Sequence, residues 1–371
     1  MTFSEKICQE INRKFYFDDF VLTNLFYKRD GVKMEICDGL IEFQDTYIIL
    51  QIKEKLLNNN ASDNIHKWLG KKVYKKAVSQ IKGSINIIQR EQDLIVEDMY
   101  GQIVKIDKSK KIVPVIIFNI NGDIEYKKVY HSVSQNININ VFSVRDYNIM
   151  MNILKMPIDI TEYLVLRSKI FAGSNVDFII DDSDENWISV GQIKSETDFA
   201  NYFIDSRIKN YSVDDIYTQS FLNIISKYHN KRTNNNFDYK QILNRMLCFD
   251  RLGAKCFMER WNLCWSDAKN RILRYKYRMV MQNEREKFGF LFISTQKGID
   301  EDCDKFYFYI SNLFVQRYEL DTAIVIINYY ESDGNFLVNW LMLSKPFKPD
   351  LALKNTLKEL NLWNSDNIIL K

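Results

Sequence analysis

The chain has 371 residues, of which 46% are hydrophobic and 14% aromatic, and it contains only 12 glycines and 4 prolines. This composition excludes a wholly disordered, collagen-like or low-complexity chain, and the length exceeds what one compact core usually holds, so we expect two domains. The net charge of +3 is too small to indicate nucleic-acid binding by itself, so the distribution of charge along the chain matters more.

Helical and strand-like hydrophobic patterns alternate through residues 1–171, which we take as the first domain. Ser4 is a candidate N-cap of the first helix, and apolar residues three or four apart from Ile65 to Arg90 predict a long helix with one buried face. The predicted order is a helix at 4–14, strands at 20–27, 36–43 and 47–53, a helix at 65–90, strands at 112–120 and 139–144, and helices at 145–154 and 159–171. This alternation predicts an α/β fold with a mixed sheet flanked by helices.

Residues 172–371 form the second expected domain, of α+β type and of unknown role. Its predicted elements are a strand at 176–181, helices near 195–205, 213–229 and 239–270, strands near 288–294, 322–329 and 335–343, and a helix near 350–361. The acidic run at 181–185 lacks the spacing of a calcium loop and is interpreted as a turn. Basic and aromatic residues interleave at 259–278, which suits nucleic acid if Arg271, Arg274 and Arg278 share a helix face, whereas Trp261 and Trp265 fit a core.

The cysteines and the hydropathy point to the cellular compartment. None of the six cysteines forms a CxxC pair, so we expect free thiols in a reducing cytosol and no zinc site. No window approaches the length of an apolar membrane span, and the N-terminus has no apolar signal core. A cytoplasmic protein without membrane association is the expectation.

The predicted hairpin of the strands 36–43 and 47–53 concentrates polar side chains on one face. Side chains alternate along a strand, and directly opposed residues point the same way, so burial of the apolar set requires a loop with an even number of residues. A loop at Asp45-Thr46 places Asp38 opposite Lys53 and Leu40 opposite Gln51. A carboxylate, an amide oxygen and an ammonium group then share one face.

This set suits phosphodiester hydrolysis. A hard divalent cation takes oxygen ligands, here Asp38, Gln51 and the backbone carbonyl of Ile52, together with water. The cation polarises the scissile phosphate and activates a water molecule, and Lys53 orients that water or stabilises the developing negative charge.

Asp38…Gln51-Ile52-Lys53 resembles the D…(D/E/Q)xK signature of the PD-(D/E)xK nucleases, in the QxK variant of Mrr-like restriction enzymes. The predicted order of elements is similar to the αβββαβ core of that superfamily, over roughly residues 1–145. The resemblance implies a restriction-endonuclease-like fold and a metal-dependent endonuclease that uses Mg²⁺ or Mn²⁺ to cut DNA, less often RNA. It also implies a role in prokaryotic restriction, repair or anti-phage defence.

The sequence departs from the family pattern at two positions. Cys37 stands where proline is frequent, and Gln51 replaces the more usual acid, which removes one negative charge from the expected metal site. In similar Gln variants a glutamate of the first helix supplies the missing carboxylate. The resemblance therefore implies Glu10 as a metal ligand, with Glu5 and Glu35 as further candidates.

Basic side chains crowd the helix that follows the second strand of the hairpin. Between His66 and Arg90 the sequence contains no acid. We expect a lysine stripe to contact phosphates, with Gln80 and Lys76 reaching toward the site; the stripe comprises Lys67, Lys71, Lys72, Lys75 and Lys76. The alternative is the solvated face of an ordinary amphipathic helix.

Three functional hypotheses follow from the sequence. The first is a metal-dependent deoxyribonuclease whose second domain recognises a trigger, a substrate feature, a protein partner or a second copy of the chain. The second is a catalytically silent nuclease-like domain that binds nucleic acid or a partner subunit, which Gln51 favours. The third is an RNA-directed nuclease, because the motif does not distinguish DNA from RNA.

Overall fold

We describe the protein from a computed structural model. The structure describes residues 1–29, 31–56, 65–120, 130–134, 137–172, 177–178, 188–189, 195–208, 215–230, 237–270, 276–282, 287–296, 303–330, 336–344 and 368–369. The chain divides into two compact units, Met1–Asn210 and Tyr211–Lys371, and we describe each by itself. Among the described residues, no helix is both long enough and apolar enough to cross a membrane.

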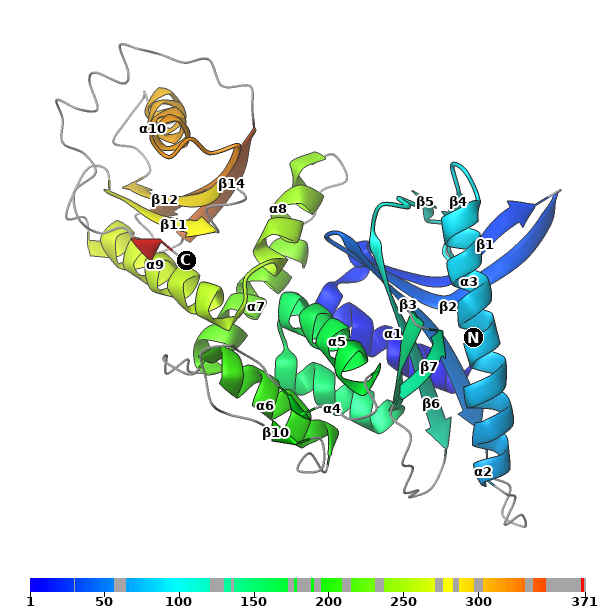
Figure 1. Ribbon diagram of the computed structural model, residues 1–371. Helices are drawn as coiled ribbons and strands as arrows, with labels where there is room; N and C mark the ends of the chain where they lie inside the picture. Colours follow the sequence, from blue (N-terminus) through cyan, green and yellow to red (C-terminus); the bar gives the residue numbers. More distant parts are fainter. Residues whose placement is uncertain are drawn as a thin grey trace. The chain divides into compact units, whose positions relative to one another are not determined.

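The first unit is organised around one sheet of eight strands in the order β5-β4-β1-β2-β3-β6-β8-β7 (Figure 1). Its strands are β1 (Val21–Arg29), β2 (Val32–Phe43), β3 (Thr46–Lys55), β4 (Ile95–Glu97), β5 (Ile103–Lys105), β6 (Lys111–Ile120), β7 (Tyr130–Ser134) and β8 (Ile137–Ser143). Strands β1, β2 and β3 are antiparallel, whereas β3, β6 and β8 run parallel. The predicted mixed sheet is confirmed. The prediction lacked β4, β5 and β7, because runs of three to five residues carry little periodicity.

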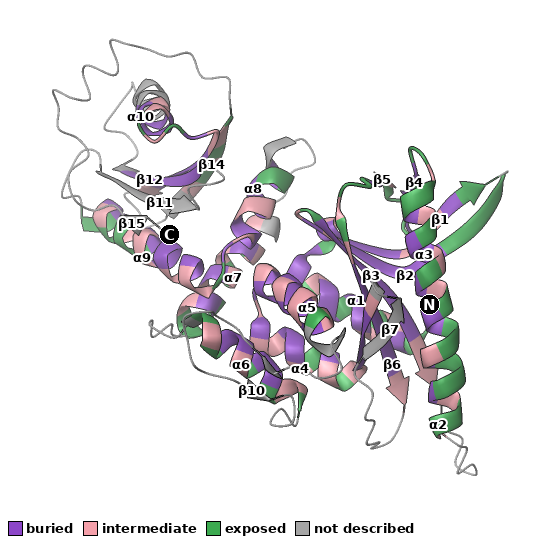
Figure 2. Ribbon diagram, in the orientation of Figure 1, coloured by how far each residue is buried: buried purple, intermediate pink, exposed green. Residues whose placement is uncertain are grey.

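Helices cover both faces of this sheet. They are α1 (Phe3–Tyr16), α2 (Ile65–Trp68), the π-helix η2 (Leu69–Ala77), α3 (Val78–Arg90), α4 (Val144–Leu154), α5 (Pro157–Ala172) and α6 (Glu196–Ile208). On β2, Leu40 packs in one core cluster with Val73 and Ala77 of η2. Phe43 lies three positions later, on the opposite face, and meets Tyr16 of α1 edge to face at 5.7 Å. Both faces are therefore buried, as the purple strands of Figure 2 show.

The first helix begins at Thr2 rather than at the predicted N-cap Ser4. The hydroxyl of Thr2 accepts the backbone N–H of Glu5, and the carboxylate of Glu5 accepts the N–H of Thr2, which completes a capping box. Ser4 is instead fully buried, and its hydroxyl accepts a hydrogen bond from Asn119 of β6 at 2.9 Å. The prediction of Ser4 as cap was wrong because the Thr2–Glu5 pair satisfies two backbone donors at once.

The predicted helix 65–90 is continuous, and its middle is a π-helix of nine residues. In the π-helix the buried residues Leu69, Val73 and Ala77 are four apart, and Ile81 and Ile85 continue this spacing in α3. In an α-helix of 3.6 residues per turn, each step of four turns the side chain about 40° past a full turn. A π-helix has more residues per turn, so the same step falls short of a full turn there, and the two parts together keep one face buried.

The first unit extends past the predicted boundary at residue 172, because ion pairs, one of them buried, hold α6 onto it. The guanidinium of Arg167 on α5 is fully buried and contacts the carboxylate of Glu196 on α6 at 2.9 Å. Arg207, near the end of α6, reaches the buried Asp159 at 2.7 Å. The division of the chain therefore follows α6, between Asn210 and Tyr211.

The second unit contains a sheet of five strands in the order β14-β13-β12-β11-β15. Its elements are α7 (Asp215–Asn230), α8 (Phe237–Leu247), α9 (Arg251–Asn270), β11 (Lys276–Gln282), β12 (Phe288–Gln296), α10 (Cys303–Arg317), β13 (Thr322–Tyr330), β14 (Phe336–Ser344) and β15 (Ile368–Ile369). Strands β12 and β13 are parallel and joined through α10, whereas β11 and β14 are antiparallel to their neighbours β12 and β13. This confirms an α+β organisation for this half.

Several predictions for the second half change. The helix predicted at 239–270 is two helices, because Cys248–Asp250 are not helical. Arg278 lies on β11, so it does not share a helix face with Arg271 and Arg274, which lie outside the described residues. The predicted helix 350–361 and the acidic turn 181–185 also lie outside them. Trp261 is 8% exposed, as expected of a core residue.

Arg167 offers a test of this packing. Replacing Arg167 with Met is expected to lower the free energy of unfolding by roughly 3–5 kcal/mol, because the carboxylate of Glu196 stays buried without its cation. The measurement is urea unfolding of the full chain. Lys111→Ala, which breaks the exposed pair with Asp45, is the control and should cost at most about 1 kcal/mol. Equal effects of the two substitutions would contradict this account.

Candidate active site

The β2–β3 hairpin sets the positions of the predicted site residues. Its ladder pairs Phe43 with Thr46 and ends at Gly39 opposite Leu50, so Gln44 and Asp45 form the turn. The predicted turn at Asp45-Thr46 was wrong, because Thr46 pairs with both Phe43 and Lys111 of β6 and so belongs to the strand. Gln44 takes a positive φ of 51° in this turn. The loop still has an even number of residues, so the predicted faces of the two strands are retained.

The ladder between β2 and β3 stops where Asp38 begins. The backbone N–H of Ile52 on β3 donates to Oδ2 of Asp38 at 2.5 Å, so a side chain takes the place of a backbone acceptor. On the other side of β2, Asn24 of β1 adopts a φ of 47°, a left-handed conformation that asparagine tolerates, and a register shift follows at Leu25/Phe26. Asp38 therefore lies where the pairing of β2 is irregular toward both neighbours, β1 and β3.

Three oxygen atoms converge on the ammonium group of Lys53. Its Nζ lies 3.0 Å from the carbonyl oxygen of Ile52, 3.2 Å from Oε1 of Gln51 and 3.5 Å from Oδ2 of Asp38. Asp38 is 8% exposed and Gln51 2% exposed, so little water screens the cluster. The structure thus brings together all four groups of the predicted centre. The predicted pairs Asp38–Lys53 and Leu40–Gln51 were wrong by two positions, because Leu40 pairs with Ile49.

Two further carboxylates act on Asp38. Burial raises the pKa of Asp38, and the neighbouring charge of Glu5 raises it further, although Lys53 and the N–H of Ile52 oppose the shift. Burial, a hydrogen bond to Asp38 and the charges of Asp38 and Glu5 also raise the pKa of Glu35. Asp38, Glu35 and Glu5 therefore form an acidic group in which ionisation of Asp38 and Glu35 is harder than in water.

The carboxylate that α1 directs toward Asp38 belongs to Glu5, not to Glu10. Glu10 is exposed, and five positions along an α-helix turn it roughly 140° away from Glu5. The choice of Glu10 as the first candidate ligand is corrected accordingly. Glu5 stands three positions after Thr2, the spacing of a capping box, so its place at the helix start carried a recognisable sequence signal.

The lysine stripe lies on the outer surface of α2 and η2. All five of its members, Lys67, Lys71, Lys72, Lys75 and Lys76, are exposed to solvent. Gln80, on α3, is different because it is half-buried and its Oε1 has no hydrogen-bond partner among the described residues. Lys76 therefore faces solvent rather than the interior, whereas Gln80 turns its amide oxygen inward.

The donor set determines which metal this centre could hold. Among the described residues, no group of three or more His, Cys, Asp or Glu side chains has the geometry of a metal site. The oxygens of Asp38, Gln51 and Ile52 nevertheless converge on one point that already carries a cationic group. One anionic and two neutral oxygen donors fit a hard cation such as Mg²⁺ or Mn²⁺. A cation bound there requires the ammonium of Lys53 to move aside.

Comparison of the chain with models of protein families, with curated proteins and with solved structures gives no match. The functional argument therefore depends on the geometry of the centre.

Asp38 itself provides a test of the electrostatics. A raised pKa means that ionisation of Asp38 is harder in the folded than in the unfolded chain, so the stability penalty grows as the pH rises above the ordinary pKa. Asp38→Asn is therefore expected to raise the Tm in the absence of divalent metal, and more at about pH 7.5 than at about pH 4.5. The measurement is differential scanning calorimetry.

Asp45→Asn is the control with the opposite sign. A hydrogen bond from Lys111 lowers the pKa of Asp45, so its charge is stabilising in the folded state and the substitution should lower the Tm at neutral pH. A fall in Tm for Asp38→Asn at neutral pH would show that the charge of Asp38 does not destabilise the folded state.

Proposed function

We propose that this chain is a metal-dependent nuclease that hydrolyses phosphodiester bonds, with DNA as the first substrate to test. The convergence of the oxygens of Asp38, Gln51 and Ile52 on the ammonium of Lys53 carries the proposal. Such a cluster matches the requirements of phosphoryl chemistry, namely hard oxygen donors for a cation and a positive group beside them.

Each residue of the centre has a role in this proposal. Asp38, Gln51 and the carbonyl of Ile52 would hold Mg²⁺ or Mn²⁺, which supplies polarisation of the scissile phosphate and activation of water. Lys53 holds a positive charge next to the phosphate oxygens and stabilises the charge that develops there. Glu35, which forms a hydrogen bond with Asp38, would take the proton of the attacking water.

The fold and the surface support the same proposal. The order α1, β1, β2, β3, α3 and β6, with the short strands β4 and β5 between α3 and β6, is similar to the αβββαβ order expected of a restriction-endonuclease-like core. The exposed lysine stripe on α2 and η2 offers contacts to the nucleic-acid backbone. A role in prokaryotic anti-phage or genome defence follows by analogy with nucleases of this architecture, and the second unit would recognise a trigger or a partner.

A catalytically silent binding module is the second candidate, and one observation favours it. The ammonium of Lys53 already contacts all three oxygens that a metal would need, so the centre is satisfied without a metal. Gln51, in place of an acid, weakens the competition of a divalent cation with that ammonium. The two candidates differ in whether a metal displaces Lys53.

A cleavage assay tests the first candidate directly. Full-length protein is incubated with plasmid, linear duplex, single-stranded DNA and RNA in Mg²⁺, Mn²⁺ or EDTA. We expect metal-dependent cutting by the wild type and a loss of about 10²-fold or more in Lys53→Ala, because a group that stabilises the developing charge is removed. Lys269→Ala, at an exposed position of α9, is the control and should cut at the wild-type rate. Equal cutting by both variants would remove Lys53 from the mechanism, and RNA-only cutting would replace DNA as the substrate.

Metal binding can be measured without any substrate. A ligand that binds only the folded state raises the Tm, so millimolar Mg²⁺ or Mn²⁺ should stabilise the wild type. Asp38→Asn should abolish this shift, because it removes the one anionic donor among the three converging oxygens. Asp45→Asn serves as the matched control and should keep the shift. A wild type with no metal-induced shift would favour the silent module.

A further inference from the structure

Strand β14 forms one edge of the sheet in the second unit (Figure 1). Its nine residues, Phe336–Ser344, have the sequence FLVNWLMLS, which contains no charged residue, no proline and no glycine. All nine pair with β13, and the pairing has no register shift. Among the described residues, no strand pairs with the other side of β14. The second unit therefore presents a long, regular and uncharged strand edge.

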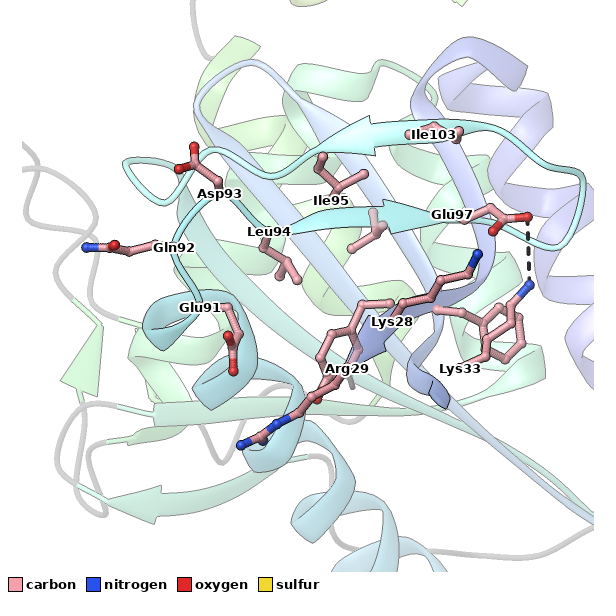
Figure 3. A pocket seen from close by; sticks show the side chains of 13 residues that line it. Lys28, Arg29, Lys33, Glu91, Gln92, Asp93, Leu94, Ile95, Glu97 and Ile103 are labelled. Carbon is pink, nitrogen blue, oxygen red and sulfur yellow. Dashed lines mark ion pairs between the residues drawn. The ribbon is translucent and has the colours of Figure 1, made fainter. Parts of the chain in front are cut away.

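The other edge strands of the two large sheets carry the features that prevent unwanted pairing, namely short length, charge or a bulge. Strand β5 has three residues and ends in Lys105. Figure 3 shows charged side chains beside it, with Glu97 of β4 joined to Lys33 of β2. Strand β7 has five residues and a register shift between Ser132 and Ser134, and β15 has only two residues. Among these described edges, β14 alone lacks all three features.

Packing on both faces of β14 holds the strand in place. The ring centre of Trp340 lies 4.8 Å from that of Tyr228 on α7 and 5.9 Å from that of Trp261 on α9. Leu343 points to the opposite face and packs against the core cluster that includes α10. Leu341, on the same face as Leu343, remains 47% exposed. Because the strand is already ordered, pairing along its edge costs little conformational entropy.

We propose that β14 pairs with β14 of a second copy of this chain, antiparallel across a two-fold axis, in one continuous sheet with five strands from each copy. Self-pairing along the whole strand places Trp340, its middle residue, on the axis. Asn339 of one copy then faces Leu341 of the other. A charged residue near the axis would lie close to the same charge of the second copy, whereas β14 brings only neutral side chains together. The charge pattern of β14 therefore fits its own copy.

The size of this edge sets the expected strength of the dimer. Nine strand residues span about 30 Å, and a single strand edge is narrow. Such a contact belongs to the small interfaces, which are typical of weak and transient complexes. We therefore expect a reversible dimer with a dissociation constant in the micromolar range. The dimer does not depend on the proposed nuclease function, and its test measures association rather than cleavage.

The test is analytical ultracentrifugation of the full chain at concentrations from about 1 to about 200 µM. We expect a monomer–dimer equilibrium for the wild type. Asn339→Lys combined with Leu341→Lys should weaken dimerisation about tenfold or more, because positive charges would face each other on both sides of the axis. Asn339→Asp combined with Leu341→Asp should do the same through negative charges. Both side chains are exposed, so both variants should fold.

A mixture of the lysine and aspartate variants should form dimers again, because opposite charges then face each other, and misfolded chains would not recover in this way. Ile216→Lys combined with Leu263→Lys is the control, since these residues of α7 and α9 are 66% and 40% exposed, and it should dimerise as the wild type does. A wild type that stays monomeric at the highest concentration would overturn the inference, because another protein or another segment of the chain would then be the occupant of the edge. Charged variants that dimerise like the wild type, or a mixture that stays monomeric, would overturn it as well.

Discussion

The hydrogen bond from the backbone N–H of Ile52 to the carboxylate of Asp38 organises the candidate centre. A side chain that occupies the place of a backbone acceptor ends the β2–β3 ladder and holds the carboxylate between the strands. The ladder that precedes it, from Phe43–Thr46 to Gly39–Leu50, fixes which face Gln51 and Lys53 occupy. Because helices bury both faces of the sheet, the polar groups lie at a point where the regular pairing of β2 with β3 stops.

The second constraint is the spacing of the apolar residues in the helix that covers this sheet. Leu69, Val73 and Ala77 keep one face buried through the π-helical segment, and Ile81 and Ile85 continue that face in the α-helix that follows. The apolar residues therefore stay against the sheet while the lysines of η2 stay on the outer face. The same spacing of residues along the helix therefore places apolar side chains in the core and lysine side chains on the surface.

The sequence could predict the elements of the first unit and the composition of its centre, because alternation and helical periodicity are local signals. It could not predict the exact register, since Thr46 pairs not only with Phe43 but also with Lys111 of β6, sixty-five positions later. It preferred Glu10 to Glu5 because the direction of α1 relative to Asp38 is a tertiary property. The boundary at 172 was set too early for a similar reason, because the ion pair of Arg167 and Glu196 joins α6 to the first unit across 29 positions.

The position of Lys53 links the chemistry of the centre to its stability. Desolvation makes the charge of Asp38 unfavourable, and Lys53 offsets part of that cost through its ammonium group. A divalent cation would bring more positive charge to the same oxygens. The ammonium of Lys53 would then move aside and could contact the phosphate. Glu35 and Glu5 add negative charge around Asp38, which favours this exchange even though Gln51 is neutral. In the proposed metal site, the carboxylates of Glu35 and Glu5 would therefore supply negative charge that the neutral Gln51 lacks.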